Sequence, residues 1–86
     1  MAIRDFFRIR KIDGTVEVLR TEHIVKFSIV PSKTYNNKTG RNEVVNYKLF
    51  VKLQNEEIML GCAETYEEAA EKFNEILHNN NFPQMF

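Results

Sequence analysis

The clearest strand in this chain reads VNYKLFVKL over residues 45–53. Its alternate residues, beginning with Val45, are all large and apolar, and the residues between them are polar except for Phe50. Because successive side chains of a strand point to opposite faces, this period of two predicts a strand with one buried face. A sheet is therefore the expected framework of the domain.

A second strand is expected directly after the first, because residues 58–62 continue the apolar pattern beyond the polar pair Asn55-Glu56. A two-residue turn at that pair places Val51 opposite Leu60. In this register Cys62 shares the inward phase of Leu60, where a free cysteine behaves as a small hydrophobe. We therefore expect a buried thiol.

Another hairpin is expected near the N-terminus, around the dipeptide Asp13-Gly14. This dipeptide tolerates the positive φ angles of a two-residue type I′ turn. Such a turn pairs Ile9 with Val18 on one face and Arg10 with Glu17 on the other, so apolar and ionic pairs separate by face.

The segment between the two hairpins predicts one more strand and a loop. Residues 24–30 are rich in β-branched and aromatic residues, and Pro31 follows them as the expected end of the strand. Residues 31–42 read PSKTYNNKTGRN, a composition that favours turns. We expect a long exposed loop there and favour disorder over a functional role.

A helix is expected to begin at Thr65, which with Glu68 forms the capping-box pattern. The apolar residues after it share one face of a helix, and the charged residues lie elsewhere. The members of this apolar stripe are Tyr66, Ala69, Ala70, Phe73, Ile76 and Leu77.

These elements predict an α+β domain of about five antiparallel strands in a small curved sheet, with one C-terminal amphipathic helix packed on one face. A chain of 86 residues accommodates one core. We assign residues 1–78 to this domain and residues 79–86 to a short apolar tail, either docked or disordered. One helix covers one face of the sheet, so the other face is expected to stay partly open.

Composition excludes several classes of protein. Hydrophobic residues make up 43% of the chain and charged residues 28%, as in globular domains. The apolar runs are far too short to span a bilayer, and the first residues lack the apolar stretch of a secretory signal. With a single cysteine, the chain fits a reducing compartment, and we expect a cytoplasmic protein.

The zero net charge conceals a division along the chain. Residues 1–52 hold 11 Lys and Arg against 5 Asp and Glu, a net charge of +6. Residues 53–86 hold 1 against 7, a net charge of −6. Such asymmetry points toward interaction surfaces, but we favour the simpler explanation that the two segments pack together and partly screen each other's charges.

The residue pattern favours no enzymatic or cofactor chemistry. Cys62 is expected to be inward, His78 suits the end of the helix dipole, and His23 lies in a turn. The isolated glycines form no phosphate-binding loop. We expect no catalytic residues, no metal or cofactor, and no small-molecule substrate.

The open sheet face and the tail are the candidate sites. The open face is predicted to carry Arg8, Arg10, Lys26, Lys48, Lys52 and Phe50, which could bind phosphates and stack a base. A solvated face with lysines that protect against aggregation accounts for the same pattern. In the tail, Phe82, Met85 and Phe86 could dock on their own sheet, on a second copy or on another protein.

The spacing of these elements resembles that of small flagellar swarming-motility proteins of the FlbD and SwrD type. The likeness runs from Ile12-Asp13-Gly14 to His23-Ile24, then from Tyr47 to Gly61, and over the helix start at residues 65–69. The chain departs from that layout at residues 31–42, at the Asn55-Glu56 turn and in the tail. We transfer no functional residues from this family. The same layout is equally compatible with a bacterial pleckstrin-like module or a small phage protein.

The sequence thus predicts a non-enzymatic module that binds a protein partner or a second copy of itself, of bacterial or phage origin. Nine asparagines among 86 residues are typical of an AT-rich genome. The alternative is a nucleic-acid binder or phage-type inhibitor that uses the basic face. We expect no association with a membrane.

Overall fold

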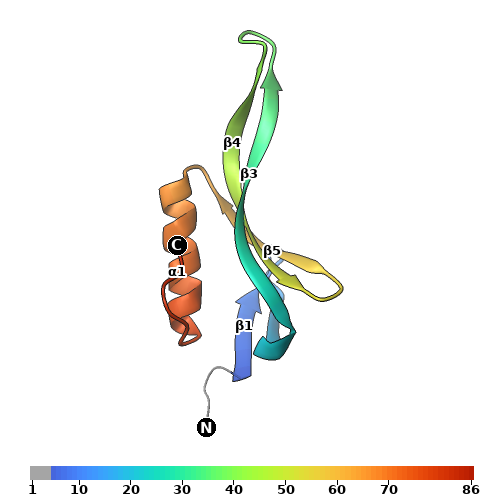
Figure 1. Ribbon diagram of the computed structural model, residues 1–86, viewed down its shortest axis with the longest axis vertical. Helices are drawn as coiled ribbons and strands as arrows, with labels where there is room; N and C mark the ends of the chain where they lie inside the picture. Colours follow the sequence, from blue (N-terminus) through green and yellow to red (C-terminus); the bar gives the residue numbers. More distant parts are fainter. Residues whose placement is uncertain (1–4) are drawn as a thin grey trace.

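The computed structural model describes residues 5–86 (Figure 1). Its elements follow in the order β1 (Phe6–Arg10), β2 (Val16–Arg20), a turn of 3-10 helix (Thr21–His23), β3 (Ile24–Asn36), β4 (Arg41–Leu53), β5 (Glu57–Ala63) and α1 (Tyr66–Asn79). Five antiparallel strands followed by one helix confirm the predicted α+β class.

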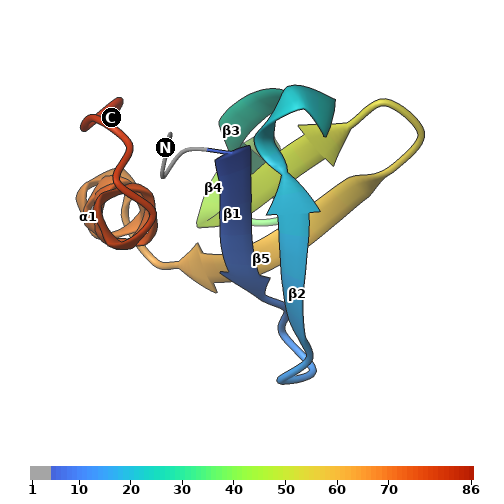
Figure 2. The same cartoon turned by 90° about the horizontal axis from the view of Figure 1, so that it is seen from below.

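The strands form two sheets rather than one. β1 pairs with β2, and the larger sheet has the order β3-β4-β5. Figure 2 shows the β1–β2 hairpin crossing the larger sheet, with α1 beside it. In this arrangement the face of the hairpin that carries Phe7 and Ile9 packs against the larger sheet, and both side chains are buried.

The core lies where the larger sheet, β1 and α1 meet. Its aromatic centre is formed by Phe7 of β1, Phe27 of β3 and Phe73 of α1, whose neighbouring ring centroids are 5.2 and 5.7 Å apart. The buried apolar residues are Phe7, Ile9, Leu49, Val51, Ile58, Ala63, Ala69, Phe73 and Leu77. All three layers are therefore needed to exclude water from the core.

The helix begins where the sequence predicts. The Thr65 hydroxyl oxygen accepts the backbone N–H of Glu68 at 3.2 Å, which satisfies one of the free donors of the first turn. The predicted apolar stripe faces the core through Ala69, Phe73 and Leu77, whereas Tyr66 at its start is 46% exposed.

The first hairpin forms around Asp13-Gly14, but the predicted two-residue turn is wrong. Lys11 N–H donates to Thr15 O at 2.8 Å, which leaves three residues in the loop, and Gly14 takes a φ of 91°. This is a type I turn with a glycine bulge. The register therefore moves by one residue, and Ile9 lies opposite Glu17 instead of Val18.

The second hairpin turns one residue earlier than predicted. Leu53 N–H donates to Glu56 O at 2.8 Å, so the turn consists of Gln54 and Asn55. Val51 consequently lies opposite Ile58 rather than Leu60. This shift of two residues leaves the buried face unchanged, because side chains alternate with a period of two.

A bulge in β5 overturns the predicted burial of Cys62. Phe50 of β4 lies opposite Met59, and Leu49 lies opposite Gly61, so Leu60 is an extra residue in β5. The extra residue reverses the inward and outward phase of the rest of the strand. Cys62 is exposed, and Ala63 is buried in its place.

The segment predicted as a long loop is an extension of the β3–β4 hairpin. β3 continues through Pro31, which lies opposite Tyr47, and ends at Asn36. Proline is tolerated here because β3 is an edge strand, paired on one side only among the described strands. Asn36 and Gly40 close the turn, where Gly40 N–H donates to Asn36 O at 2.8 Å.

This extension, residues 31–46, is called the arm below. Figure 1 shows it projecting at the top, away from β1, β5 and the core. The molecule measures 56 × 25 × 22 Å, and its radius of gyration is 14.7 Å. A compact chain of this length has a radius of gyration of about 12 Å, so the arm makes the molecule markedly elongated.

Candidate interaction surfaces

The structure divides the predicted basic face between the two sheets. Lys26 lies opposite Lys52, and Lys48 and Phe50 occupy the same outer face of the larger sheet. Arg8 and Arg10 lie on the smaller sheet, opposite Val18 and Val16. The six predicted residues therefore form two surfaces, of which the first carries three lysines and the aromatic ring.

Charges on the outer face of the larger sheet partly compensate one another. Lys26 and Lys52 are directly opposed like charges, which is an unfavourable cross-strand pair. On its other side Lys52 lies opposite Glu57 of β5, which is a favourable pair. Phe50 is half-buried in the row formed with Ser28 and Met59. The face is therefore only moderately basic.

A groove runs between β1, β5 and the C-terminal end of α1, on the side of the molecule that carries Arg8 and Arg10. Its volume is about 760 Å³. Its lining consists of Arg8, Ile9, Arg10, Lys11, Ile12, Val16, Leu60, Gly61, Cys62, Ile76, Asn79 and Asn80. Three of these residues are cationic, none is acidic and none is aromatic. The groove thus combines positive charge with aliphatic walls.

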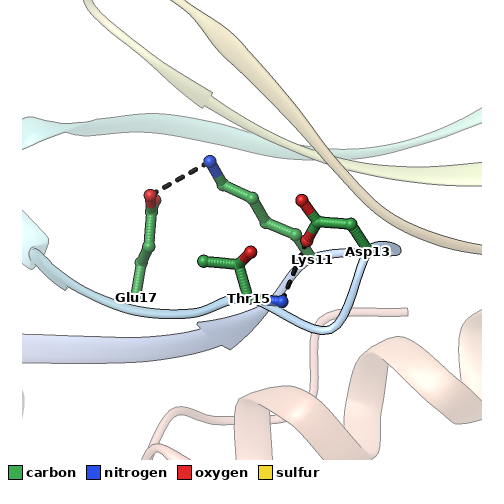
Figure 3. A network of polar contacts seen from close by, with 4 residues as sticks. All are labelled: Lys11, Asp13, Thr15 and Glu17. Atoms are coloured by element: carbon green, nitrogen blue, oxygen red, sulfur yellow. Dashed lines mark hydrogen bonds and ion pairs between the residues drawn. The ribbon is translucent and has the colours of Figure 1, made fainter.

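The turn beside the groove is held by local polar contacts, shown in Figure 3. Lys11 Nζ lies 3.0 Å from Glu17 Oε1, and this hydrogen bond raises the pKa of Lys11. Asp13 Oδ1 accepts the backbone N–H of Thr15 at 2.9 Å, and this bond lowers the pKa of Asp13. Lys11 is therefore partly neutralised, whereas Arg8 and Arg10 form no ion pair within the described part of the chain.

The side chain of Asn80 joins the end of α1 to β1. Asn80 Oδ1 accepts the backbone N–H of Arg8 at 2.7 Å, and Asn80 Nδ2 donates to Arg8 O at 3.1 Å. The same nitrogen donates to Ile76 O at 2.8 Å. The amide of Asn80 therefore makes the two hydrogen bonds with Arg8 that the backbone of a neighbouring strand would make. Sequence reasoning missed this role because three consecutive asparagines read as the fraying end of a helix.

The tail packs against the core of the same chain. The ring of Phe82 meets those of Phe7 and Phe27 edge to face, at centroid distances of 5.2 and 6.0 Å. Phe86 stacks on Phe73 at 4.9 Å. Met85, the third predicted tail residue, is 55% exposed.

Asn74 of α1 fixes the end of the tail. Its Oδ1 accepts the N–H groups of Met85 and Phe86 at 3.3 and 3.1 Å, and its Nδ2 donates to Phe86 O at 2.9 Å. Phe82 and Phe86 are therefore committed to intramolecular contacts, which leaves Met85 as the exposed apolar side chain of this segment.

The arm exposes apolar side chains and unpaired strand edges. Tyr35 is 59% exposed, Val44 44% and Val45 51%. β5 pairs with β4 only from Tyr47 onward, so within the described strands the edge of β4 over residues 41–46 has no neighbour. Sequence reasoning missed the arm because its polar composition resembles that of a loop.

The described residues contain no cluster of three or more His, Cys, Asp or Glu side chains that could hold a metal ion. Within residues 5–86, no helix is both long and apolar enough to cross a membrane. Comparison of the chain with models of protein families, with characterised proteins and with solved structures found no match.

Proposed function

We propose that this protein is a non-enzymatic interaction module that associates with a second copy of itself through its arm. The observation that carries the proposal is that the arm extends beyond the core with open strand edges and exposed apolar side chains. Strand edges of this kind are templates for pairing with another chain. The exposed Cys62 thiol supports placing the protein in the reducing cytoplasm.

The edge of β4 supplies a self-complementary surface. Antiparallel pairing of residues 43–46 with the same residues of a second copy creates a twofold axis between Val44 and Val45 and places Val44 of each copy opposite Val45 of the other. The paired stretch of four residues is about 13 Å long in each chain, at about 3.3 Å per residue. Because this contact buries less area than a standard stable interface, we expect a dimer that forms at micromolar to millimolar protein concentrations.

Sedimentation equilibrium over that concentration range tests the proposal. The wild-type protein is expected to shift from monomer to dimer as its concentration rises. Replacing Val44 and Val45 together by lysine places like charges beside the axis, and the double variant is expected to remain monomeric. Val25→Lys is the matched control, because Val25 is 57% exposed and lies in β3 before the arm. A wild-type protein that stays monomeric, or a double variant that dimerises like the control, contradicts the proposal.

Binding of nucleic acid is the second candidate function. The observation that favours it is that the arm is a two-stranded ribbon carrying Lys33, Lys38 and Arg41, on the same hairpin as the basic outer face. A ribbon of this width fits the major groove of duplex DNA. This reading predicts binding to labelled duplexes that weakens steeply with salt and falls in Lys52→Glu. Equal affinity at low and near-physiological salt, or an unaffected variant, contradicts it.

A further inference from the structure

We propose that the groove between β1, β5 and the end of α1 binds an extended acidic segment of another protein, which adds to β1 as a new strand. This surface is separate from the arm, and the inference does not depend on self-association. It rests on the backbone geometry of β1, on the charge of the groove and on the chemistry of its walls.

The backbone of β1 has an outer edge that faces the groove. Arg8 directs its N–H and C=O away from β2, since both bond to the side chain of Asn80. Residues of an antiparallel pair alternate between bonding across the pair and bonding outward. Lys11 fits this alternation, because its N–H donates to Thr15 across the hairpin. Arg10 therefore directs its N–H and C=O outward, in the same direction as Arg8.

Asn80 shows that this edge accepts a hydrogen-bonding neighbour. Its amide supplies one acceptor and one donor to Arg8, the pair of groups that a peptide unit of an added strand supplies. An incoming strand continues this pattern at Arg10, where the described chain provides no further strand on that side. The added strand therefore lies along the same edge of β1 as the side chain of Asn80.

The charge of the groove selects an acidic segment. Arg8, Arg10 and Lys11 line it; Lys11 is paired with Glu17, whereas Arg8 and Arg10 have no ion-pair partner among the described residues. The C-terminal end of a helix carries partial negative charge on its last carbonyls, but in α1 these carbonyls accept hydrogen bonds from the chain itself and offset the cations little. Leu77 O accepts N–H groups of Asn80 and Phe82, and His78 O accepts that of Asn81. The positive potential therefore reaches the ligand.

The walls of the groove favour a peptide over a nucleic acid. Ile12, Val16, Leu60 and Ile76 offer aliphatic contacts, and the lining has no aromatic ring on which a base could stack. The volume of this open groove, about 760 Å³, is similar to that of sites that hold drug-sized ligands, and a few residues of an extended segment are of that size. The ligand that fits is an extended segment in which acidic and aliphatic residues alternate.

Gly61 has no side chain, which leaves the β5 side of the groove open. A Cβ placed at Gly61 would have no atom within 4 Å, so a side chain there would project into open space beside β5. Its backbone does not occupy the left-handed region, and a larger residue can therefore be introduced without strain. Gly61→Val is expected to narrow the groove while it leaves the fold intact.

Selection from a displayed library of random twelve-residue peptides tests the proposal directly, because the library samples acidic, neutral and basic segments alike. The expected result is enrichment of peptides with a net negative charge and apolar residues at alternate positions. A selection without enrichment, or one that yields neutral or basic peptides, overturns the proposal.

Variants then locate the binding of a fluorescein-labelled selected peptide, measured by anisotropy. Arg10→Gln is expected to weaken binding about tenfold, because it removes a charge-assisted contact but keeps the N–H. Arg10→Pro also removes the outward N–H, which an edge strand tolerates, and is expected to weaken binding further. Gly61→Val is expected to abolish binding with little change in melting temperature.

Two controls separate this site from the other surfaces. Lys52→Gln, on the outer face of the larger sheet, and the double lysine variant of the arm are both expected to bind the peptide as the wild type does. Unchanged binding in Arg10→Gln and Gly61→Val overturns the proposal. Equal affinity of Arg10→Pro and Arg10→Gln also overturns it, since no backbone pairing is then involved. Displacement of the peptide by oligothymidylate at equal charge concentration indicates a non-selective cationic surface and overturns it as well.

Discussion

Phe82→Ala tests whether the tail is part of the core. The Phe82 ring packs edge to face on Phe7, which is fully buried, and on Phe27. Removing a fully buried phenylalanine costs about 3–5 kcal/mol. Because Phe82 is only partly buried, we expect a loss of about 2–3 kcal/mol, which includes the aromatic contacts. For a domain of this size, that loss lowers the melting temperature by roughly 10–20 °C.

Urea unfolding followed by circular dichroism measures this effect, with Met85→Ala as the matched control. Met85 lies in the same tail but is 55% exposed, so its truncation is expected to change the free energy of unfolding by less than about 0.5 kcal/mol. If Phe82→Ala is no more destabilising than Met85→Ala, the tail does not pack on the core in solution, and the reasoning from the aromatic contacts is wrong.

Three further predictions concern the turns and the helix start. Gly14→Ala places a Cβ at a φ of 91° and is expected to lower the free energy of unfolding by about 1–2 kcal/mol; an unchanged urea midpoint would show that the turn relaxes. Thr65→Ala is expected to cost about 1 kcal/mol and Thr65→Ser much less, since serine retains the capping oxygen; equal losses in urea unfolding contradict a capping role. The lowered pKa of Asp13 means that its bond to Thr15 stabilises the fold above the ordinary value of 3.8 and is lost as the pH falls through the lower, folded-state pKa. The stability difference between wild type and Asp13→Ala, measured by thermal unfolding against pH, is therefore expected to shrink at acid pH; a constant difference excludes this linkage.

Local patterns in the sequence predicted the elements well. The helix start is encoded in Thr65 and Glu68, which act within one turn. The hairpin at Asp13-Gly14 forms because Gly14 accepts a positive φ. Each of these signals depends on neighbours a few residues away, so it can be recognised without the tertiary fold.

The strand register and the positions of the candidate sites depend on loop length, on a bulge and on the order of strands in the sheet, which these local patterns do not determine. Asp13-Gly14 is compatible with two-residue and three-residue loops, which differ by one residue in register. The bulge at Leu60, which decides that Cys62 is exposed, has as its local signal the isolated Gly61 inside the strand, and that signal alone does not fix which residue is the extra one. A proline ends a central strand but is tolerated in an edge strand, so the effect of Pro31 depends on the position of β3 in the sheet. That position is a property of the whole sheet and cannot be seen in the local sequence.

The candidate surfaces were predictable only in part. The alternation in β4 correctly placed Lys48, Phe50 and Lys52 on one face. The two arginines were assigned to that face because a single sheet was assumed. The groove depends on the crossing of two sheets and on Asn80, whose partner Arg8 is 72 residues away. A weak signal for the arm existed in the valines before Tyr47 and in the turn glycine Gly40.

The bond between Asn80 and Arg8 has a consequence for the order of folding. Within residues 24–79 each strand pairs with the next along the chain and α1 packs on all three strands, so these contacts span shorter stretches of chain than the one between Arg8 and Asn80. The β1–β2 hairpin also forms locally, but its Phe7 and Ile9 reach the core only when the two ends of the chain meet. We therefore expect docking of this hairpin to be the late, slow step of folding, and amide hydrogens of β1 to exchange with solvent sooner than those of the central strand β4.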